Sequence, residues 1–203
     1  MRNLFLLWLA FISPAAAGQP APILLDALRQ GGLILFFRHA ETGSASPDQA
    51  QAVIGQCETQ RNLSAEGRAQ AVAIGALMRE LDIPVGRVLA SPFCRTMETA
   101  SLAFGRADVE PALSLPRHTG DAQALRAMGE ALRGLIPDSL PARDNLVLVG
   151  HSYHLLAVGG PRLEPQGSIA VLRLMGNGSM MLLGTLSPRD WAKLAERQLA
   201  LAP

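Results

Sequence analysis

Three short apolar runs constrain the fold of this 203-residue chain more than any other feature. Residues 33–37 (LILFF) and 145–149 (NLVLV) are almost continuously apolar, and residues 85–90 (VGRVLA) form a third, mostly apolar run that Arg87 interrupts. A strand with one face in water alternates apolar and polar residues, whereas a continuous apolar run needs cover on both faces. The runs therefore predict strands buried in a sheet that has helices on both sides.

Helical patterns lie between and around these runs. Apolar residues recur with helical spacing in residues 23–30, behind Ser64, and in 95–104, 121–135 and 188–199. Ser64 is the expected N-cap of its helix. Residues 168–174 and 180–186 flank a Gly-Asn-Gly sequence and predict a hairpin. Alternating strands and helices predict an α/β fold: a single three-layer domain with a mainly parallel central sheet flanked by helices.

The N-terminus has the three-part pattern of a secretory signal peptide. Arg2 gives the positive start, residues 4–12 form an apolar run, and three alanines at 15–17 precede the expected cleavage site. The run is well short of the roughly 20 apolar residues that cross a bilayer. We therefore expect a signal peptide over 1–17 and one domain over 18–203. The expected location is outside the cytoplasm, in a bacterial periplasm, without stable membrane insertion after cleavage.

Composition limits the classes of partner. The chain has 18 Lys and Arg against 17 Asp and Glu, a formal net charge of +1. This balance excludes nucleic-acid binding driven by bulk charge, so any anion site must be local. The two cysteines, Cys57 and Cys94, would meet oxidising conditions in an exported protein. They could form a disulfide or remain separate buried residues, and both alternatives stay open.

Arginine and histidine side chains follow all three predicted strands. Arg38 and His39 come after the first run, Arg95 after the second, and His151 after the third. Because ligands of open α/β sheets bind beyond the carboxyl ends of the strands, we expect these four side chains to converge. Four hydrogen-bond donors for oxyanions predict a phosphate pocket. The acidic and histidine residues show no familiar metal-ligand spacing, so neither a metal nor another cofactor is expected.

Four segments around these residues resemble the histidine phosphatase superfamily, which includes phosphoglycerate mutases and phosphohistidine phosphatases. They are FFRHAET at 36–42, LSAEGRAQA at 63–71, SPFCRTMETA at 91–100 and LVGHS at 148–152, in the order of the family. Each segment alone is a weak signal, but four in order are specific. The resemblance implies a phosphoglycerate mutase-like fold. One departure is Ala40, where the family usually has glycine.

The resemblance also implies a mechanism. His39 would be the nucleophile that attacks phosphorus and forms a phosphohistidine, and it would have to be neutral to do so. Arg38, Arg95 and His151 would hold the phosphate oxygens, which needs no metal. His151 would work best as a cation or a hydrogen-bond donor.

Two further residues are candidates for substrate binding. The phosphohistidine phosphatase branch has an arginine just before the helix that follows the nucleophile loop, and Arg61 occupies that place. The alternative for Arg61 is a solvated loop charge. Glu41 directly follows the nucleophile motif, but it could equally cap or brace the loop.

The general acid that protonates the leaving oxygen has no clean match to the family pattern. Glu110, His118 and Asp121 are the candidates in the corresponding region. Substrates with leaving groups of low pKa, and phosphoramidates, need less help from an acid.

These features predict a metal-independent phosphatase that hydrolyses a small-molecule phosphate ester. The long insertions typical of phosphoglycerate mutases are missing, so a phosphomutase is the weaker alternative. A catalytically weak or inactive module that binds a phosphate ligand is another alternative, and the intact His39 argues against it. The layout is similar to that of exported family members that dephosphorylate a heptose of the lipopolysaccharide core. An envelope sugar phosphate is therefore a candidate substrate.

Overall fold

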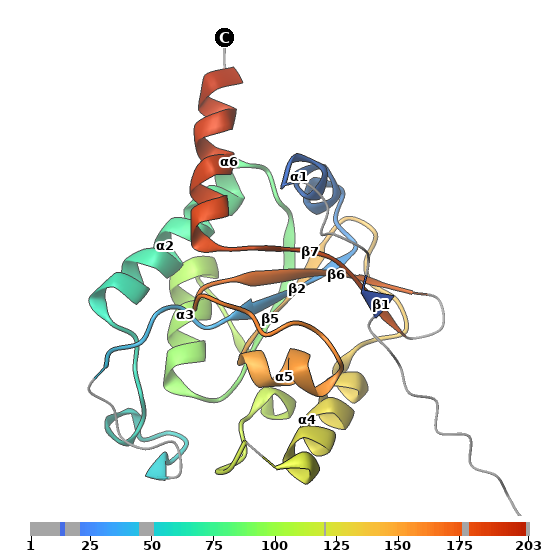
Figure 1. Ribbon diagram of the computed structural model, residues 1–203. Helices are drawn as coiled ribbons and strands as arrows, with labels where there is room; N and C mark the ends of the chain where they lie inside the picture. The colour runs from blue at the N-terminus through green and yellow to red at the C-terminus, as the bar shows by residue number, and fades with distance from the viewer. Residues whose placement is uncertain (1–12, 15–20, 45–50, 120, 176–178, 202–203) are drawn as a thin grey trace, which may run out of the picture.

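One sheet forms the centre of the protein, and helices cover both of its faces (Figure 1). The computed structural model describes residues 13–14, 21–44, 51–119, 121–175 and 179–201. The strand order within these residues is β1-β7-β6-β2-β5-β3-β4. The strands are β1 (Ser13–Pro14), β2 (Leu33–Arg38), β3 (Val85–Ala90), β4 (Asp108–Val109), β5 (Asn145–Gly150), β6 (Ile169–Leu174) and β7 (Met180–Leu186).

Most neighbouring strands run parallel, as predicted. β2 and β3 both pair in parallel with β5, and β4 pairs in parallel with β3. The exceptions are β6 and its two neighbours, β2 and β7, which it joins in antiparallel fashion. The predicted hairpin is therefore confirmed as β6 and β7, while its turn at 176–178 lies outside the described residues. The mainly parallel α/β architecture is the predicted one.

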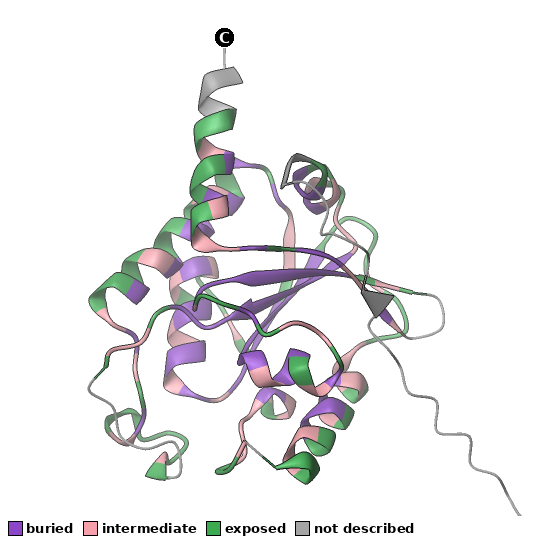
Figure 2. Ribbon diagram, in the orientation of Figure 1, coloured by how far each residue is buried: buried purple, intermediate pink, exposed green. Residues whose placement is uncertain are grey.

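The sheet is buried on both faces because two sets of helices pack against it (Figure 2). Leu33, Leu35 and Phe37 of β2 face one apolar cluster, whereas Ile34 and Phe36 face the other. The first cluster includes residues of α1 (Ala21–Gln30), α2 (Ala65–Glu80), α3 (Cys94–Phe104) and α6 (Pro188–Leu201). The second includes residues of α4 (Ala122–Leu135) and α5 (Ser152–Ala157).

Helix starts follow the expected capping chemistry. The Ser64 hydroxyl accepts a hydrogen bond of 2.9 Å from the Gly67 amide and so caps α2, as predicted. The Asp121 carboxylate caps α4 in the same way, accepting from the Ala124 amide at 2.6 Å. The structure also shows short 3₁₀ helices at Cys57–Thr59 and Pro111–Leu113 that were not predicted.

Most of the predicted signal peptide lies outside the described residues. Of residues 1–17, the structure describes Ser13–Pro14, which pair with Met181 and Leu182 of β7. Among the helices that are described, none combines the length and apolar character needed to cross a membrane.

Candidate active site

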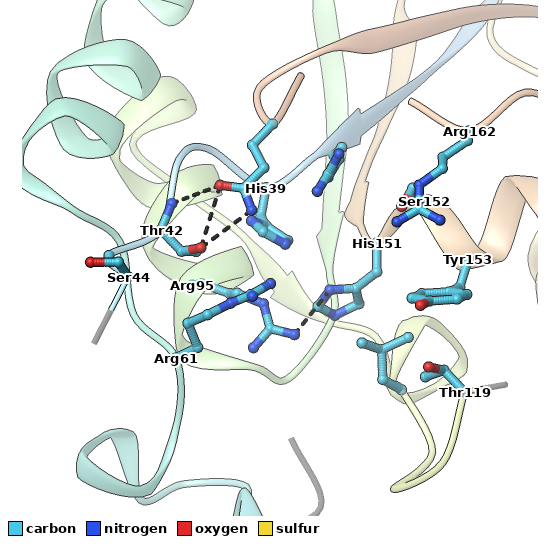
Figure 3. A pocket seen from close by; sticks show the side chains of 14 residues that line it. His39, Thr42, Ser44, Arg61, Arg95, Thr119, His151, Ser152, Tyr153 and Arg162 are labelled. Atoms are coloured by element: carbon cyan, nitrogen blue, oxygen red, sulfur yellow. Dashed lines mark hydrogen bonds between the residues drawn. The ribbon is translucent and has the colours of Figure 1, made fainter. Parts of the chain in front are cut away.

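Backbone pairing brings the ends of three strands together. In the register, Arg38 at the end of β2 lies opposite Gly150, and Ala90 lies opposite Val149. The His39 amide extends this pairing with a hydrogen bond of 3.0 Å to the Gly150 carbonyl. A pocket of about 730 Å³ opens at this edge of the sheet. Its lining includes all four residues predicted to converge there, namely Arg38, His39, Arg95 and His151 (Figure 3).

His39 is held with one ring nitrogen toward the backbone. Its Nδ1 lies 2.8 Å from the Ala40 carbonyl oxygen, and a carbonyl can only accept. Nδ1 therefore carries the proton and Nε2 keeps its lone pair. Burial, followed by the positive charge of Arg95, lowers the pKa of His39 well below its ordinary value, outweighing the Ala40 hydrogen bond. The imidazole is thus neutral at neutral pH, the form that a nucleophile requires.

Two buried arginines flank this imidazole. Arg38 donates from Nη1 to the Leu163 carbonyl at 2.6 Å and forms an ion pair with Glu164. The Arg95 guanidinium lies 4.7 Å above the centre of the Phe93 ring, a favourable cation–π distance. Burial lowers the pKa of Arg95 to about 9, with smaller contributions from nearby Arg61 and Arg38. Arg95 therefore remains a cation at neutral pH.

His151 takes the neutral form, with one ring nitrogen as acceptor and the other as donor. Its Nδ1 lies 3.3 Å from Nη2 of Arg95, and its Nε2 lies 3.1 Å from the Ser91 hydroxyl. Because arginine can only donate, Nδ1 accepts and Nε2 carries the proton. Burial, followed by the charge of Arg95, lowers the pKa of His151 well below its ordinary value. His151 is therefore neutral: its Nδ1 accepts from Arg95, while its Nε2–H remains a hydrogen-bond donor, the second of the two expected forms. The cation is disfavoured because it would be desolvated and repelled.

Arg61 also lines the pocket, as the first of its two alternatives predicted. It belongs to a segment, residues 51–63, that is tied to the start of α3. Cys57 forms a disulfide with Cys94, with 5.7 Å between their Cα atoms, so the pairing left open by the sequence is present. Beside it, the Gln60 side chain accepts a hydrogen bond of 2.9 Å from the Cys94 amide. The role of Arg61 in substrate binding stays a prediction.

Glu41 does not line the pocket. It is exposed, and its backbone rather than its carboxylate makes the contacts: the amide donates to Gln70 at 3.1 Å and the carbonyl accepts from Ser64 at 3.0 Å. The structure thus favours the alternative in which Glu41 braces the nucleophile loop against α2.

The three candidate general acids also lie outside the pocket. Glu110 accepts from the Ala112 amide at 3.0 Å and begins a 3₁₀ helix, while the Asp121 carboxylate caps α4. His118 is exposed and lines a separate hollow together with Asp121. Their side chains are committed to helix starts or to solvent, which explains why the segment does not supply an acid here. Among the described residues that line the pocket, none is a carboxylate.

One wall of the pocket was missed by sequence reasoning. The 161–168 segment carries Arg162 and Gln166, and Gln166 accepts a hydrogen bond of 2.8 Å from the Thr42 amide. The segment reaches the site because β6, which follows it, pairs antiparallel with β2. Its sequence, PRLEPQGS, has no apolar periodicity from which its position beside the pocket could have been predicted.

The pocket is strongly cationic. Arginines at 38, 61, 95 and 162 line it, and Glu164 pairs with the first and last of these from its edge. Partial burial alone would raise the pKa of Glu164, but hydrogen bonds from Arg162 and Arg38 lower it below its usual value. Among the residues that the structure describes, no cluster of three His, Cys, Asp or Glu could hold a metal ion. The site is therefore suited to an anion.

The tautomer and charge of His39 can be tested by ¹⁵N NMR. Because burial and Arg95 lower its pKa, we expect the ring to give the signals of a neutral, Nδ1-protonated imidazole at pH 6.5, where an ordinary histidine is half protonated. His39→Gln identifies the signal. A His39 ring that is half protonated at this pH would contradict the argument.

Comparison with known proteins agrees with this geometry. Residues 34–115 match the model of the histidine phosphatase superfamily (branch 1). No curated protein matched the chain. Among solved structures, the protein histidine phosphatase SixA complexed with tungstate superposes with a TM-score of 0.54 at 18% identity, covering 78% of this chain and 98% of that chain.

Two other solved structures superpose on this chain with similar TM-scores. A phosphoserine phosphatase variant from Entamoeba histolytica, in complex with phosphoserine, has a TM-score of 0.53 at 14% identity, covering 78% of this chain and 98% of its own. An open reading frame product of Mycobacterium tuberculosis has a TM-score of 0.52 at 22% identity, with 74% and 95% covered. At these identities the likeness shows a shared fold. The resemblance itself is confirmed by the family match, which covers residues 34–115 and so includes Arg38, His39 and Arg95.

Proposed function

We propose that this protein is a metal-independent phosphatase that hydrolyses a small phosphomonoester through a phosphohistidine on His39. The observation that carries the proposal is the orientation of this imidazole. Its Nδ1–H is held by the Ala40 carbonyl, so the Nε2 lone pair is the ring's free nucleophile in a pocket lined by arginines. A receptor for phosphate would need the arginines but not a neutral histidine held in this way.

The reaction follows from these positions. The guanidinium groups of Arg38, Arg61 and Arg95 bind the non-bridging oxygens and offset their charge. Nε2 of His39 attacks phosphorus, a P–N bond forms, and the P–O bond to the leaving group breaks. The imidazole then carries a positive charge, which the Ala40 carbonyl stabilises through Nδ1–H. Water next attacks phosphorus, breaks the P–N bond and returns the electron pair to Nε2.

His151 serves this reaction as a positioning residue. Its Nδ1 accepts from Arg95, and its Nε2–H donates to the Ser91 hydroxyl at the end of β3. The ring edge also packs against Phe93, with 5.3 Å between ring centres. Arg95 is therefore held in one orientation before substrate arrives, which reduces the reorganisation needed during the reaction.

Hydrolysis of p-nitrophenyl phosphate between pH 5 and 8, with EDTA present, tests the proposal. We expect metal-independent turnover that His39→Ala abolishes, because the variant lacks the nucleophile. Arg95→Ala should lower kcat about 10²- to 10³-fold, the usual cost of losing one such donor. Arg117→Ala is the matched control, since Arg117 is exposed and outside this pocket, and its activity should equal that of the wild type.

Two outcomes would replace the proposal with its alternatives. A folded wild type that binds vanadate without turnover would favour the phosphate-binding module. Activity that depends on a bisphosphate primer would favour the mutase.

The described residues that line the pocket include no carboxylate, and this affects which leaving groups can depart easily. With no carboxylate among these described residues, the leaving oxygen or nitrogen would depart with little proton donation from them. This favours aryl phosphates, anhydrides and phosphoramidates over alkyl esters. Glu164 lies at the edge of the site, paired with Arg38, but its lowered pKa keeps it ionised and unable to give a proton at neutral pH.

A series of substituted aryl phosphates measures this dependence. We expect kcat/KM to fall steeply as the pKa of the leaving phenol rises, because negative charge builds on an oxygen that no acid protonates. Glu164→Gln should leave the slope unchanged. A shallow slope in the wild type would reveal a general acid, and a slope that steepens in Glu164→Gln would identify it as Glu164.

We also propose that the protein is exported and acts on a substrate of the cell envelope. The three-part pattern of residues 1–17 supports export, and the Cys57–Cys94 disulfide is of the kind that persists in oxidising compartments. A sugar phosphate of the envelope is the candidate substrate there; because it is an alkyl ester, it should be cleaved measurably but more slowly than p-nitrophenyl phosphate. Phosphate release from purified envelope sugar phosphates, at an enzyme concentration that cleaves p-nitrophenyl phosphate, is the expected result. No release under these conditions would exclude this substrate class.

A further inference from the structure

The pocket is larger than a phosphoryl group requires. Its volume of about 730 Å³ lies within the range of roughly 300–1,000 Å³ that holds whole small-molecule ligands. The leaving group of the substrate must therefore also lie inside the pocket, and the side chains around it can select among leaving groups.

The cationic side chains are distributed on two sides of His151 (Figure 3). Arg61 and Arg95 lie on one side, close to His39, whereas Arg162 and Tyr153 lie on the other. Arg162 comes from the 161–168 segment and Tyr153 from α5. With a phosphoryl group at His39 bound by Arg38, Arg61 and Arg95, the part of the pocket lined by Arg162 and Tyr153 is left for the leaving group.

Arg162 is oriented by two neighbours. Its Nε donates to the Glu164 carboxylate at 3.1 Å, and its guanidinium carbon lies 5.9 Å from the centre of the Tyr153 ring. Within the described part of the chain, neither of its Nη groups has a hydrogen-bond partner. The guanidinium thus keeps its outer pair of donors available, and this pair matches the two oxygens of a carboxylate or phosphate.

The balance of charge in the pocket also favours a ligand that carries a second anionic group. Among the described residues, four arginines line the pocket, and Glu164 and the phosphoryl dianion of the substrate offset them with one negative charge fewer than the four guanidinium groups carry. Arg162 shares its carboxylate partner, Glu164, with Arg38, so this single charge does not neutralise both guanidinium groups.

We propose that Arg162 and Tyr153 form a leaving-group subsite that selects phosphate esters bearing a second anionic oxygen group on a planar or ring-shaped leaving group. Arg162 binds the anion through its Nη groups, and the Tyr153 ring packs against the flat part of the leaving group. This inference rests on the proposed phosphatase function and narrows its substrate class.

A matched pair of substrates tests the subsite. Phenyl phosphate and 3-carboxyphenyl phosphate differ by one carboxylate that changes the acidity of the leaving phenol little. We expect the wild type to prefer the carboxylated ester by about tenfold or more in kcat/KM, the effect of one charge-assisted hydrogen bond. Arg162→Ala should reduce this preference to near one. Tyr153→Phe should keep it, because the aromatic face remains.

Two control variants separate the subsite from a general attraction of anions. Arg61→Ala should lower kcat/KM for both esters and leave their ratio unchanged. Arg117→Ala should change neither value. A preference that persists in Arg162→Ala, or that is lost equally in Arg61→Ala, would overturn the subsite.

Binding measurements keep this test independent of turnover. Phenylphosphonate and 3-carboxyphenylphosphonate are not hydrolysed, and calorimetry on the full chain gives their Kd ratio directly. A Kd ratio of about ten between the two phosphonates that disappears in Arg162→Ala supports the subsite. If neither ester is cleaved, the subsite stands on this binding result and the proposed phosphatase function has failed. His39-dependent cleavage of both esters with equal kcat/KM and equal Kd leaves the phosphatase intact and eliminates the subsite.

Discussion

The position of β2 between a parallel and an antiparallel neighbour governs the arrangement of the site. On one side, parallel pairing with β5 places Arg38 opposite Gly150 and thus next to His151. On the other side, antiparallel pairing with β6 returns the 161–168 segment to the nucleophile, where the Gly167 amide donates to the His39 carbonyl at 3.0 Å. Both pairings lie in the buried centre of the sheet, so the apolar residues of β2 stabilise the geometry of the residues that follow it.

A group of arginines at the edge of an apolar core is unfavourable by itself, because desolvation and mutual repulsion both oppose it. The structure compensates each buried guanidinium differently. Arg38 uses the Leu163 carbonyl and the Glu164 carboxylate, while Arg95 uses the ring face of Phe93 and the Nδ1 of His151. Burial, followed by the same repulsion from Arg95, keeps His39 and His151 neutral. A dianionic ligand would relieve this repulsion, so affinity for phosphate and neutrality of the nucleophile have a common origin.

Local patterns were sufficient to predict the sheet and the centre of the site. Continuous apolar runs required burial on both faces, and the order of strands and helices required parallel strands whose ends meet, which placed Arg38, His39, Arg95 and His151 together. Side chains that depend on longer-range contacts could not be placed in this way. Arg162 reaches the pocket through the pairing of β6 with β2, and Glu110 and Asp121 are used by local helix starts that compete for acidic side chains. The neutrality of His151 depends on burial, which the sequence pattern does not reveal.

The bond between Cys57 and Cys94 joins two parts of the anion site. Arg61 follows Cys57 by four residues in the chain, and Arg95 directly follows Cys94, so one covalent link closes a 37-residue separation and holds both guanidinium groups at one pocket. Closing a loop of this size removes much of the conformational freedom of the intervening chain. The disulfide therefore limits how far Arg61 and Arg95 can move apart, so the spacing of these two pocket cations depends on the oxidised state of the two cysteines.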